Sequence, residues 1–342
     1  MNPRISIIIL NWNGWEDTIE CLESLYRITY PNYDVIVVDN DSKNESVQKI
    51  REYCGGEIEV ESKFFEYSGE NKPIKIIEYT REEAEAGGGK EGEIVDSPHN
   101  RRLVFIKNKK NYGFAEGNNI GIRYALKALN PDYVLLLNND TVVDPEFLGE
   151  LVKVGESDGM IGFVGAKVYF YDKSNLIQFT GGGKIELVKG RAPRIASGET
   201  DNGQYDSCYE VGYIGGSCLL CKTDVVKKVG VLDPAYFAYW EETDWCLRGS
   251  KIGYKSIYVF RSKIWHKGGA SGGSCIEAYY LARNRFYFIK QHATKKQYLS
   301  FLIYFFGFQF WYMGYIYSIS HKNINAFMSF LRGTWDGIKG VH

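Results

Sequence analysis

The stretch 133–141 constrains the fold most strongly, because an apolar run of strand type stops abruptly on Asn138, Asn139 and Asp140. A buried strand with this ending delivers short oxygen-bearing side chains to the carboxyl edge of a sheet, where open α/β folds bind ligands. Asp140 offers the hard oxygen that Mg²⁺ or Mn²⁺ takes when it bridges a protein carboxylate and a nucleotide diphosphate. A simple turn before a helix opened by Asp144 is the alternative, and position alone does not exclude it.

Composition limits the class of protein. With 342 residues, 44% hydrophobic and 24% charged, the chain can bury one large core or two smaller ones. Its formal net charge of -1 gives no basic surface for DNA or RNA, so no nucleic acid is expected as a partner. The apolar run Ile5–Leu10 is too short for a secretory signal, so we expect the catalytic part to be cytoplasmic.

The cysteines do not form a disulfide pattern. There are 7, an odd number at scattered spacings, and we expect them to be reduced. Cys218 and Cys221 have the spacing of a metal or redox pair, but no second pair accompanies them and they lie in an apolar stretch. Core packing is therefore favoured over zinc binding.

Two strand-like runs flank a helical pattern near the N-terminus. The run Ile5–Leu10 ends on Asn11, and the run 33–38 ends on Asp39, while apolar residues between them recur at helical spacing. Strand, helix and strand with polar carboxyl ends predict a βαβ unit of the nucleotide-binding kind. Asp39 is placed either to accept hydrogen bonds from a base or ribose or to cap the next helix.

The stretch 55–102 differs in character from its surroundings. It is rich in glutamate and glycine and has no sustained helical period, although 57–61 and 73–77 are candidates for short edge strands. We expect most of it to be a solvated insertion, and a loop of this length beside a site is also able to contact a substrate. After it, Asn111 and Gly113 mark a strand-to-helix junction that suits close approach to a ligand, although glycine turns without ligands are common.

Acidic residues mark a second candidate site. Glu241, Glu242 and Asp244 stand at the expected start of a helix beside three aromatic residues. Acids in a first helical turn complement the helix dipole, but aromatic neighbours also desolvate a carboxyl and raise its pKa toward the range of a general base. His266 follows a strand-like stretch, and a lone histidine there is more often structural than a ligand.

Seven motifs in this order resemble family 2 glycosyltransferases of GT-A fold, particularly the rhamnosyltransferase-like branch, over about residues 3 to 290. They are Ile5–Leu10 with Asn11-Trp12-Asn13, Val38-Asp39-Asn40, Asn111-Tyr112-Gly113-Phe114, Asn138-Asn139-Asp140, Gly215-Gly216-Ser217, Trp240-Glu241-Glu242-Thr243-Asp244 and Trp265-His266. The resemblance implies an α/β fold whose mostly parallel central sheet is flanked by helices. It also implies inverting transfer of a sugar from a nucleotide-diphosphate sugar, such as a dTDP-rhamnose-like or UDP-sugar donor, to a hydroxyl of a glycan or lipid-linked glycan.

The resemblance also implies roles for residues. Asp39 would bind the base and Trp12 would lie against it, while Glu242 takes the position of the catalytic base, supported by Glu241 and Asp244. By motif position, nucleotide-sugar binding falls to Asn11, Trp12, Asp39, Asn111, Gly113, Asn138 and Asn139, acceptor binding to Gly215, Gly216, Ser217 and Trp240, and Mg²⁺ or Mn²⁺ binding to Asp140 and His266.

The chain departs from the family pattern at two positions. Asn138 replaces the first aspartate of the metal motif, and the base position carries Glu242 where the family usually has aspartate. One carboxylate, a histidine and the diphosphate still fill much of an octahedral shell. The Gln-x-x-Arg-Trp motif of processive polymer synthases is absent, so we expect one sugar to be transferred per acceptor.

The C-terminal part is expected to differ from the rest of the chain. We expect a glycosyltransferase domain over 1–290 and a hydrophobic helical segment over 291–342, in which 298–319 carries no charge and is rich in aromatic residues. Aromatic residues spread through its middle favour a membrane surface, with a spanning helix and packing on the domain or a second subunit as alternatives. The expected location is therefore peripheral, at the inner face of the cell membrane.

Two other functions remain open. A sugar-phosphate nucleotidyltransferase has a similar core, but it needs a glycine-rich phosphate loop with basic residues after the first strand, which 11–15 lacks. A catalytically inactive nucleotide-sugar-binding subunit is motivated by Asn138 and opposed by the presence of Asp140, Glu242 and His266.

Overall fold

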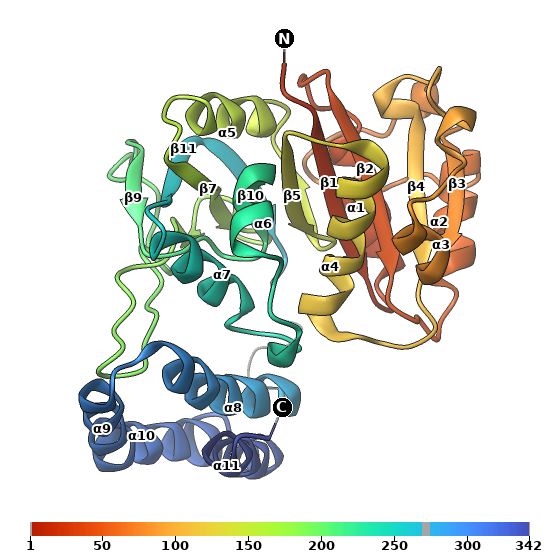
Figure 1. Ribbon diagram of the computed structural model, residues 1–342. Coiled ribbons are helices and arrows are strands. Elements are labelled where there is room, and N and C mark those ends of the chain that lie inside the picture. Colours follow the sequence, from red (N-terminus) through yellow and green to blue (C-terminus); the bar gives the residue numbers. More distant parts are fainter. Residues whose placement is uncertain (1, 269–273, 342) are drawn as a thin grey trace.

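The computed structural model describes residues 2–268 and 274–341, and its centre is one 11-stranded mixed sheet covered by helices (Figure 1). The first half of the chain contains β1 (Ile5–Asn11), α1 (Trp15–Leu25), β2 (Tyr33–Asp39), α2 (Ser46–Gly55), β3 (Lys75–Thr80), α3 (Arg81–Ala86), β4 (Arg102–Lys107), α4 (Gly113–Tyr124), the π-helical η4 (Ala125–Leu129), β5 (Tyr133–Asn138), β6 (Thr141–Val143) and α5 (Phe147–Gly155). Strands β3, β4, β2, β1 and β5 are neighbours in this order and all parallel.

The second half makes the sheet mixed. It contains β7 (Ile161–Phe170), β8 (Ile177–Phe179), β9 (Tyr209–Val211), β10 (Cys218–Lys222), α6 (Thr223–Val229), the 3₁₀ turn η5 (Pro234–Tyr236), α7 (Glu241–Ser250) and β11 (Lys255–His266). Strand β10 runs antiparallel between β5 and β7, and β11 runs parallel to β7 but antiparallel to β6. The expected α/β fold with a largely parallel sheet is confirmed, with these antiparallel strands as additions.

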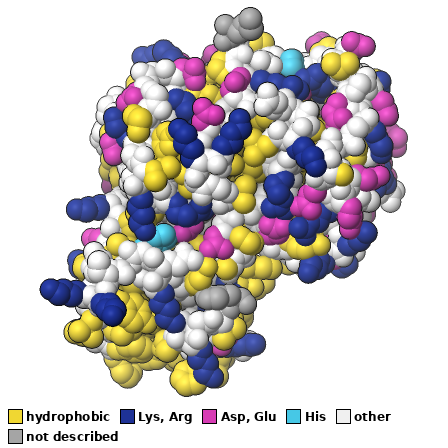
Figure 2. Space-filling view, in the orientation of Figure 1, with side chains coloured by type: hydrophobic (Ala, Val, Ile, Leu, Met, Phe, Trp, Pro, Cys, Tyr) yellow, Lys and Arg dark blue, Asp and Glu magenta, His cyan; other side chains and the backbone are white. Residues whose placement is uncertain are grey.

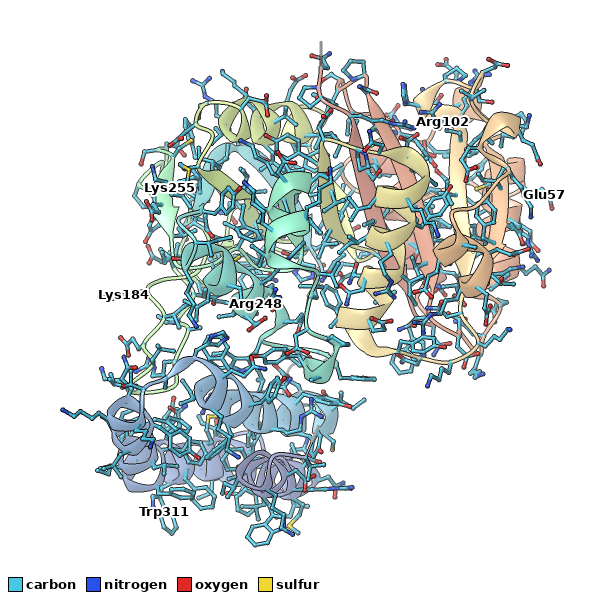
Figure 3. All side chains as sticks on the ribbon, viewed as in Figure 1. Glu57, Arg102, Lys184, Arg248, Lys255 and Trp311 are labelled. Carbon is cyan, nitrogen blue, oxygen red and sulfur yellow. The ribbon has the colours of Figure 1, made fainter. Side chains whose placement is uncertain are left out.

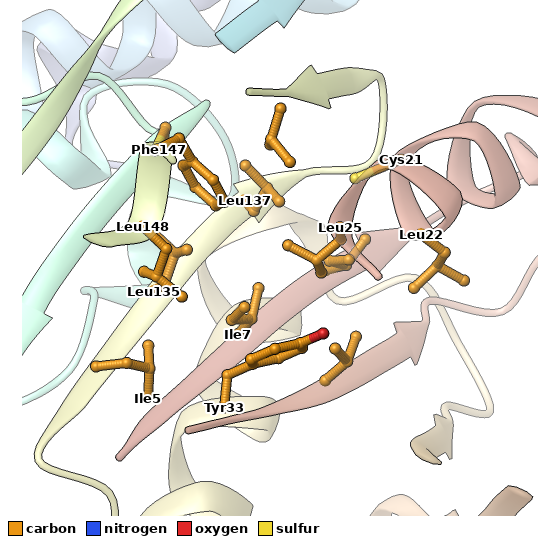
Figure 4. Packing of buried hydrophobic residues seen from close by; sticks show 14 of the residues in the cluster. Ile5, Ile7, Cys21, Leu22, Leu25, Tyr33, Leu135, Leu137, Phe147 and Leu148 are labelled. Atoms are coloured by element: carbon orange, nitrogen blue, oxygen red, sulfur yellow. The ribbon is translucent and has the colours of Figure 1, made fainter. Parts of the chain in front are cut away.

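Strands β1, β2 and β5 are buried on both faces, which explains their continuous apolar sequences. On one face, Ile7 and Leu135 pack against Leu25 of α1 and Leu148 of α5 (Figure 4). On the other face, α4 lies so close to β1 that a Cβ on Gly121 would stand 2.7 Å from the side chain of Ile8. The alternation of side chains along one strand thus divides the core into two layers.

The expectation of a solvated insertion over 55–102 is only partly right. Residues 75–80 form β3, which pairs with β4 and buries Ile77 and Tyr79, and Thr80 with Glu83 forms a capping box that begins α3. Strand β3 thus extends the edge of the sheet by one strand, and α3 follows it in the chain. The residues 57–61 form no strand, and the remainder holds only the 3₁₀ turns η1 (Gly69–Asn71), η2 (Glu91–Glu93) and η3 (His99–Arg101).

A separate helical unit follows the sheet, shown in blue in Figure 1. It consists of α8 (Cys275–His292), α9 (Lys295–Tyr304), the π-helical η6 (Phe305–Gln309), α10 (Phe310–Tyr315), the π-helical η7 (Ile316–Ser320) and α11 (Ile324–Lys339). Its core contains Phe286, Phe301 and Phe330 and extends to Trp240 of the sheet-containing part. The predicted boundary at residue 290 falls inside α8, and α8 shares a hydrophobic cluster with α11.

The helical stretch Lys295–Ser320 is long and apolar enough to cross a membrane by length and composition, with a mean hydropathy of 1.3. Much of its apolar surface is exposed, and hydrophobic side chains gather on this part of the molecule (Figure 2). Trp311, which is 69% exposed, points away from the helical core (Figure 3).

Truncation after Ala293 is expected to destabilise the whole chain, because it uncovers Phe286, Phe288 and Ile289, all fully buried in the full-length protein. Each such side chain contributes about 2 kcal/mol when buried, so the midpoint of thermal unfolding should fall by about 10 °C or more. The control Trp311→Ser removes an exposed side chain and should leave the midpoint unchanged. An unaltered midpoint in the truncated protein would show that the helical unit is not part of the cooperative core.

Candidate functional site

The carboxyl ends of β1 and β2 form one polar corner. Asn11 is fully buried and donates from Nδ2 to Oδ1 of Asp39 at 2.8 Å, while Ser42 donates to the same carboxylate from its backbone N–H and its hydroxyl. The alternative that Asp39 caps the next helix is wrong, because α2 begins only at Ser46. Trp12, next to this corner, keeps 50% of its surface exposed.

An asparagine network, which sequence analysis missed in part, holds the start of α4. Asn40 donates to Oδ1 of Asn111 at 2.8 Å and to the carbonyl of Gly113 at 3.1 Å, and it accepts from Asn108 at 3.0 Å. Gly113 has φ of +78°, and a Cβ there would stand 2.6 Å from Phe237. The predicted junction residues therefore lie beside Asp39 and against the segment that precedes α7.

Asp140 and His266 meet at the edge of the sheet because β6 pairs with β11. In this pairing His266 stands opposite Thr141, and its Nε2 lies 3.1 Å from Oδ1 of Asp140. The backbone N–H of Gly268 donates to the other carboxylate oxygen at 3.2 Å. Burial raises the pKa of Asp140, but the hydrogen bond and charge of His266 outweigh it, so the pKa lies below its usual value.

Gln178 orients His266, a role that sequence analysis did not anticipate. Its Oε1 lies 2.6 Å from Nδ1 of His266, so Nδ1–H donates to Gln178 and Nε2 is directed toward Asp140. Either a proton or a metal ion between Nε2 and the carboxylate oxygen satisfies both atoms at 3.1 Å. Metal-ligating histidines commonly donate their other ring N–H in this way.

The two residues fit a Mg²⁺ or Mn²⁺ ion. Adjacent ligands of an octahedral ion with bonds of about 2.1 Å stand about 3.0 Å apart, close to the separation of Asp140 and His266. Asn138 adds a buried Oδ1 that has no hydrogen-bond partner within residues 2–268 and 274–341. In the same described ranges no group of three acidic, histidine or cysteine residues forms a metal cluster. A metal ion held by Asp140 and His266 would therefore have further coordination positions for ligand oxygens or water.

The acids of α7 occupy a second, drier position. Glu241 is only 4% exposed, and the Oε2 atoms of Glu241 and Glu242 are both buried without a hydrogen-bond partner in the described part of the chain. Burial raises the pKa of both carboxyls, and the neighbouring Glu242 raises that of Glu241 further. Arg194, which no motif indicated, partly offsets the shift of Glu242. Each carboxyl thus takes up a proton more readily than an exposed glutamate.

Asp244 serves a different purpose from its two neighbours. Its carboxylate is fully buried and binds Arg248 and Nε2 of His292, each at 2.7 Å. Both oxygens are engaged, so Asp244 joins α7 to α8. The predicted role of Asp244 in supporting the base or acceptor stays a prediction.

The other predicted residues lie between these positions. The carbonyl of Ser217 accepts the backbone N–H of Asn138 at 3.1 Å, which puts the turn Gly215-Gly216-Ser217 beside the end of β5. Asn139 instead donates to the carbonyl of Gly14 and to Thr18, so it fastens β5 to α1. Trp240 packs on Phe288 of α8, with ring centroids 4.9 Å apart, and only 8% of it is exposed.

The segment 184–194 contacts the helical unit and ends at Arg194, whose charge acts on Glu242 of α7. A Cβ on Gly190 would stand 2.6 Å from Phe301 of α9, so this segment lies directly on the unit, and Figure 1 shows it reaching down from the sheet. Lys184, labelled in Figure 3, marks the start of the segment. Tyr213 donates to the carbonyl of Ala192 at 3.0 Å, which fixes the end that carries Arg194.

Cys218 and Cys221 are core residues, as expected. Both are buried on β10, but Cys218 belongs to the cluster on one face of the sheet and Cys221 to the cluster on the other. Side chains on opposite faces cannot bind one ion. The seven cysteines are all free in the structure.

Most of the chain matches a known protein family. Residues 6–72 and 92–230 match the family model described as "Glycosyl transferase family 2". The gap between the two matched ranges contains β3 and α3, the unit that widens the sheet.

Curated relatives belong to glycan biosynthesis. The chain is 24% identical over 252 residues to the low-salt glycan biosynthesis hexosyltransferase Agl10 of Haloferax volcanii, covering 73% of this chain and 63% of that protein. It is 38% identical over 63 residues, 18% of this chain and 20% of the relative, to an N-acetylglucosaminyl-diphospho-decaprenol L-rhamnosyltransferase of Mycobacterium tuberculosis. The chain spans less than two thirds of the length of both relatives.

A solved structure confirms the fold. The mannosyltransferase PcManGT of Pyrobaculum calidifontis, in complex with GDP-Man and Mn²⁺, superposes with a TM-score of 0.57 over 100% of this chain and 89% of that chain. The two sequences are 12% identical, so the likeness concerns the fold alone. The predicted GT-A fold is thereby confirmed.

We predict that Asp140→Ala abolishes the Mn²⁺-dependent part of UDP or GDP binding, because it removes the carboxylate of the pair. Gln178→Leu should weaken Mn²⁺ affinity by about 10-fold to 100-fold, since it frees the ring of His266 from its orienting partner. Isothermal titration with Mn²⁺ in the presence of each nucleotide measures both effects.

The matched control is Asp158→Ala, which removes a half-exposed carboxylate paired with Lys255 on the surface. It should bind Mn²⁺ and nucleotide like the unmodified chain. Metal-dependent nucleotide affinity that persists in Asp140→Ala would rule out this pair as the metal site.

Proposed function

Because the chain belongs to glycosyltransferase family 2, we propose that it transfers one sugar, with inversion, from a nucleotide-diphosphate sugar to a hydroxyl of a glycan or lipid-linked glycan. The observation that carries this proposal is the pairing of Asp140 with His266 at the ligand edge of the sheet, together with two desolvated glutamates at the start of α7. A UDP-sugar or a dTDP-rhamnose-like sugar is the proposed donor.

The nucleotide is proposed to lie over the corner of β1 and β2. Asp39 is fixed by Asn11 and Ser42, so its carboxylate can receive hydrogen bonds without changing position. The exposed ring of Trp12 offers a flat surface to a base, and the turn at Gly113 lets the backbone approach closely.

The diphosphate is proposed to meet Asp140 and His266. When bound there, Mg²⁺ or Mn²⁺ neutralises negative charge on the leaving diphosphate. The protein's own part is orientation: Gln178 holds the ring of His266, and Gly268 holds one oxygen of Asp140. Asn138 carries no charge, which leaves Asp140 as the single carboxylate of the motif.

Glu242 is proposed as the general base. It accepts the proton of the acceptor hydroxyl while that oxygen bonds to the anomeric carbon and the bond from this carbon to the diphosphate oxygen breaks. Attack from the face opposite the leaving group inverts the anomeric centre. Burial raises the pKa of Glu242, which brings it closer to the working pH and makes it a better proton acceptor.

We propose a membrane surface as the place of action. The stretch Lys295–Ser320 and α11 expose large apolar side chains, namely Leu299, Ile303, Phe306, Phe308, Trp311, Tyr312, Tyr315, Ile319, Ile324, Met328 and Trp335. Their number and their concentration on one unit exceed what a soluble surface usually carries. A lipid-linked acceptor would be reached from the inner face of the cell membrane, with the sheet in the cytoplasm.

We predict that Glu242→Gln lowers turnover by about 10² to 10⁴ while donor binding stays nearly intact, because the amide keeps the shape but accepts no proton. Hydrolysis of UDP-glucose, UDP-N-acetylglucosamine, GDP-mannose and dTDP-rhamnose with Mn²⁺, followed as released nucleoside diphosphate, provides the assay. Turnover of the unmodified protein should rise with pH through a midpoint above the usual glutamate value of 4.5, since the base works only when deprotonated.

Glu241→Gln is the matched control, because it changes the adjacent buried carboxyl in the same way and should reduce turnover less. Loss of turnover in Glu241→Gln with normal turnover in Glu242→Gln would assign the base to Glu241. Absence of hydrolysis with every donor, despite Mn²⁺-dependent binding, would favour the inactive binding subunit.

We predict that the full-length protein floats with vesicles of phosphatidylethanolamine and phosphatidylglycerol. The double variant Ile303→Asp with Trp311→Asp should float several-fold less, because it adds charge to the exposed apolar face. The control is Ile252→Asp, which adds the same charge at an apolar side chain that is 52% exposed but distant from this unit in the chain. Equal flotation of the double variant and the unmodified chain would contradict membrane docking through α9 and α10.

A further inference from the structure

The backbone just before the two glutamates has an unusual conformation. Phe237, Tyr239 and Trp240 have φ values of 62°, 68° and 78°, and none of them is glycine. A side chain disfavours this left-handed region, so such a cluster persists only when surrounding contacts hold it. Trp240 is the N-cap of α7, so this segment fixes the direction in which Glu241 and Glu242 leave the loop.

One side chain from α8 holds most of this segment. Asn284 is fully buried, and its Nδ2 lies 2.8 Å from the carbonyl of Tyr236, 2.7 Å from that of Ala238 and 2.8 Å from that of Tyr239. Three carbonyl oxygens therefore converge on one amide nitrogen.

Arg283 fixes the orientation of this amide. Its Nε donates to Oδ1 of Asn284 at 2.8 Å, while its Nη2 donates to the carbonyls of Ala235 and Tyr236. Since Arg283 has only donors and the three carbonyls have only acceptors, the amide can face them in only one way. Arg283 and Asn284 together thus form a clamp around 235–239.

The carboxyls of Glu241 and Glu242 receive hydrogen bonds from backbone N–H groups at the start of α7. Their Oε2 atoms are buried without hydrogen-bond partners in the part of the chain that is described, so the backbone that carries Glu241 and Glu242 sets where these carboxyls lie. A second link from the same helix, His292 to Asp244, holds the next turn of α7 at 2.7 Å.

We propose that Asn284 is a positioning residue for the reaction: it holds the loop 236–240 in its left-handed conformation and thereby places the catalytic glutamate. This inference rests on the proposed function, because it takes Glu242 as the base. The helical unit then contributes to the reaction, because α8 supplies the clamp. Other side chains of α8 pack in the aromatic core of the unit.

The test compares Asn284→Ala and Asn284→Asp with Tyr279→Phe. The first two remove or invert the amide, and Asp places a carboxylate oxygen against three carbonyls. Tyr279→Phe removes a hydrogen bond of 2.8 Å from the same helix to Asp336 of α11 and leaves the clamp intact. Three quantities are measured on full-length protein: thermal midpoint, UDP affinity with Mn²⁺, and hydrolysis of the four nucleotide sugars across pH.

We expect both Asn284 variants to lose about 10-fold to 100-fold in kcat, with UDP affinity within about twofold of the unmodified chain, because the clamp lies on the base side of the site. The midpoint of the pH–rate profile should also shift, since the carboxyl changes its surroundings. Tyr279→Phe should keep kcat and the pH midpoint even where its thermal midpoint falls.

Unchanged kcat and pH midpoint in a folded Asn284→Ala protein would overturn the inference, as would failure of both Asn284 variants to fold, because Asn284 would then be a structural residue. A loss of kcat in Tyr279→Phe equal to that in Asn284→Ala would overturn it as well. The proposed function is rejected separately, by normal turnover in Glu242→Gln. Loss of turnover in Glu242→Gln together with normal turnover in the Asn284 variants rejects only the positioning role of Asn284.

Discussion

The short antiparallel pairing of β6 with β11 is the interaction on which the site depends. It sets His266 opposite Thr141 and therefore next to Asp140, although the two residues come from distant parts of the chain. Strand β11 also runs along β7, so the histidine is carried on a strand held from two sides. A shift of this register by one residue would turn His266 to the other face and separate it from the carboxylate.

The second half of the site is held in a different way. The polar corner of β1 and β2 uses short polar side chains at the ends of rigid parallel strands, where Asn11 and Ser42 fix Asp39. The acidic helix begins instead from backbone in the left-handed region and receives its support from α8. The two halves therefore respond to different changes: the first to sheet register, the second to the packing of the helical unit.

Much of this arrangement follows from local sequence. The run before Asn138 predicted a buried strand with polar residues at its carboxyl end, and the acids from Glu241 predicted a helix start, both as found. Seven ordered motifs also predicted the family and fold, which the comparisons confirm. Local patterns sufficed there because strand burial and helix starts leave periodic or capping signals in neighbouring residues.

Other parts left no local signal. Gln178 and Asn284 act through contacts with residues far away in the chain, so nothing in their own neighbourhoods distinguishes them from other amides. Strand β3 lies in a charged stretch that resembles a solvated loop, because an edge strand buries only alternate residues such as Ile77 and Tyr79. The predicted boundary at 290 lies inside α8, whose partners in α11 come from a later part of the chain and leave no signal near that residue.

Asp140 and His266 are proposed to hold the metal that binds the leaving diphosphate. Pulsed electron paramagnetic resonance on Mn²⁺ and UDP bound to the full-length chain tests this proposal most directly, because it detects a nitrogen nucleus bonded to the ion. We expect a ¹⁴N coupling that becomes a ¹⁵N coupling when histidine is labelled and disappears in His266→Ala. Bound Mn²⁺ that shows phosphorus couplings but no histidine nitrogen would rule out His266 as a ligand of the ion.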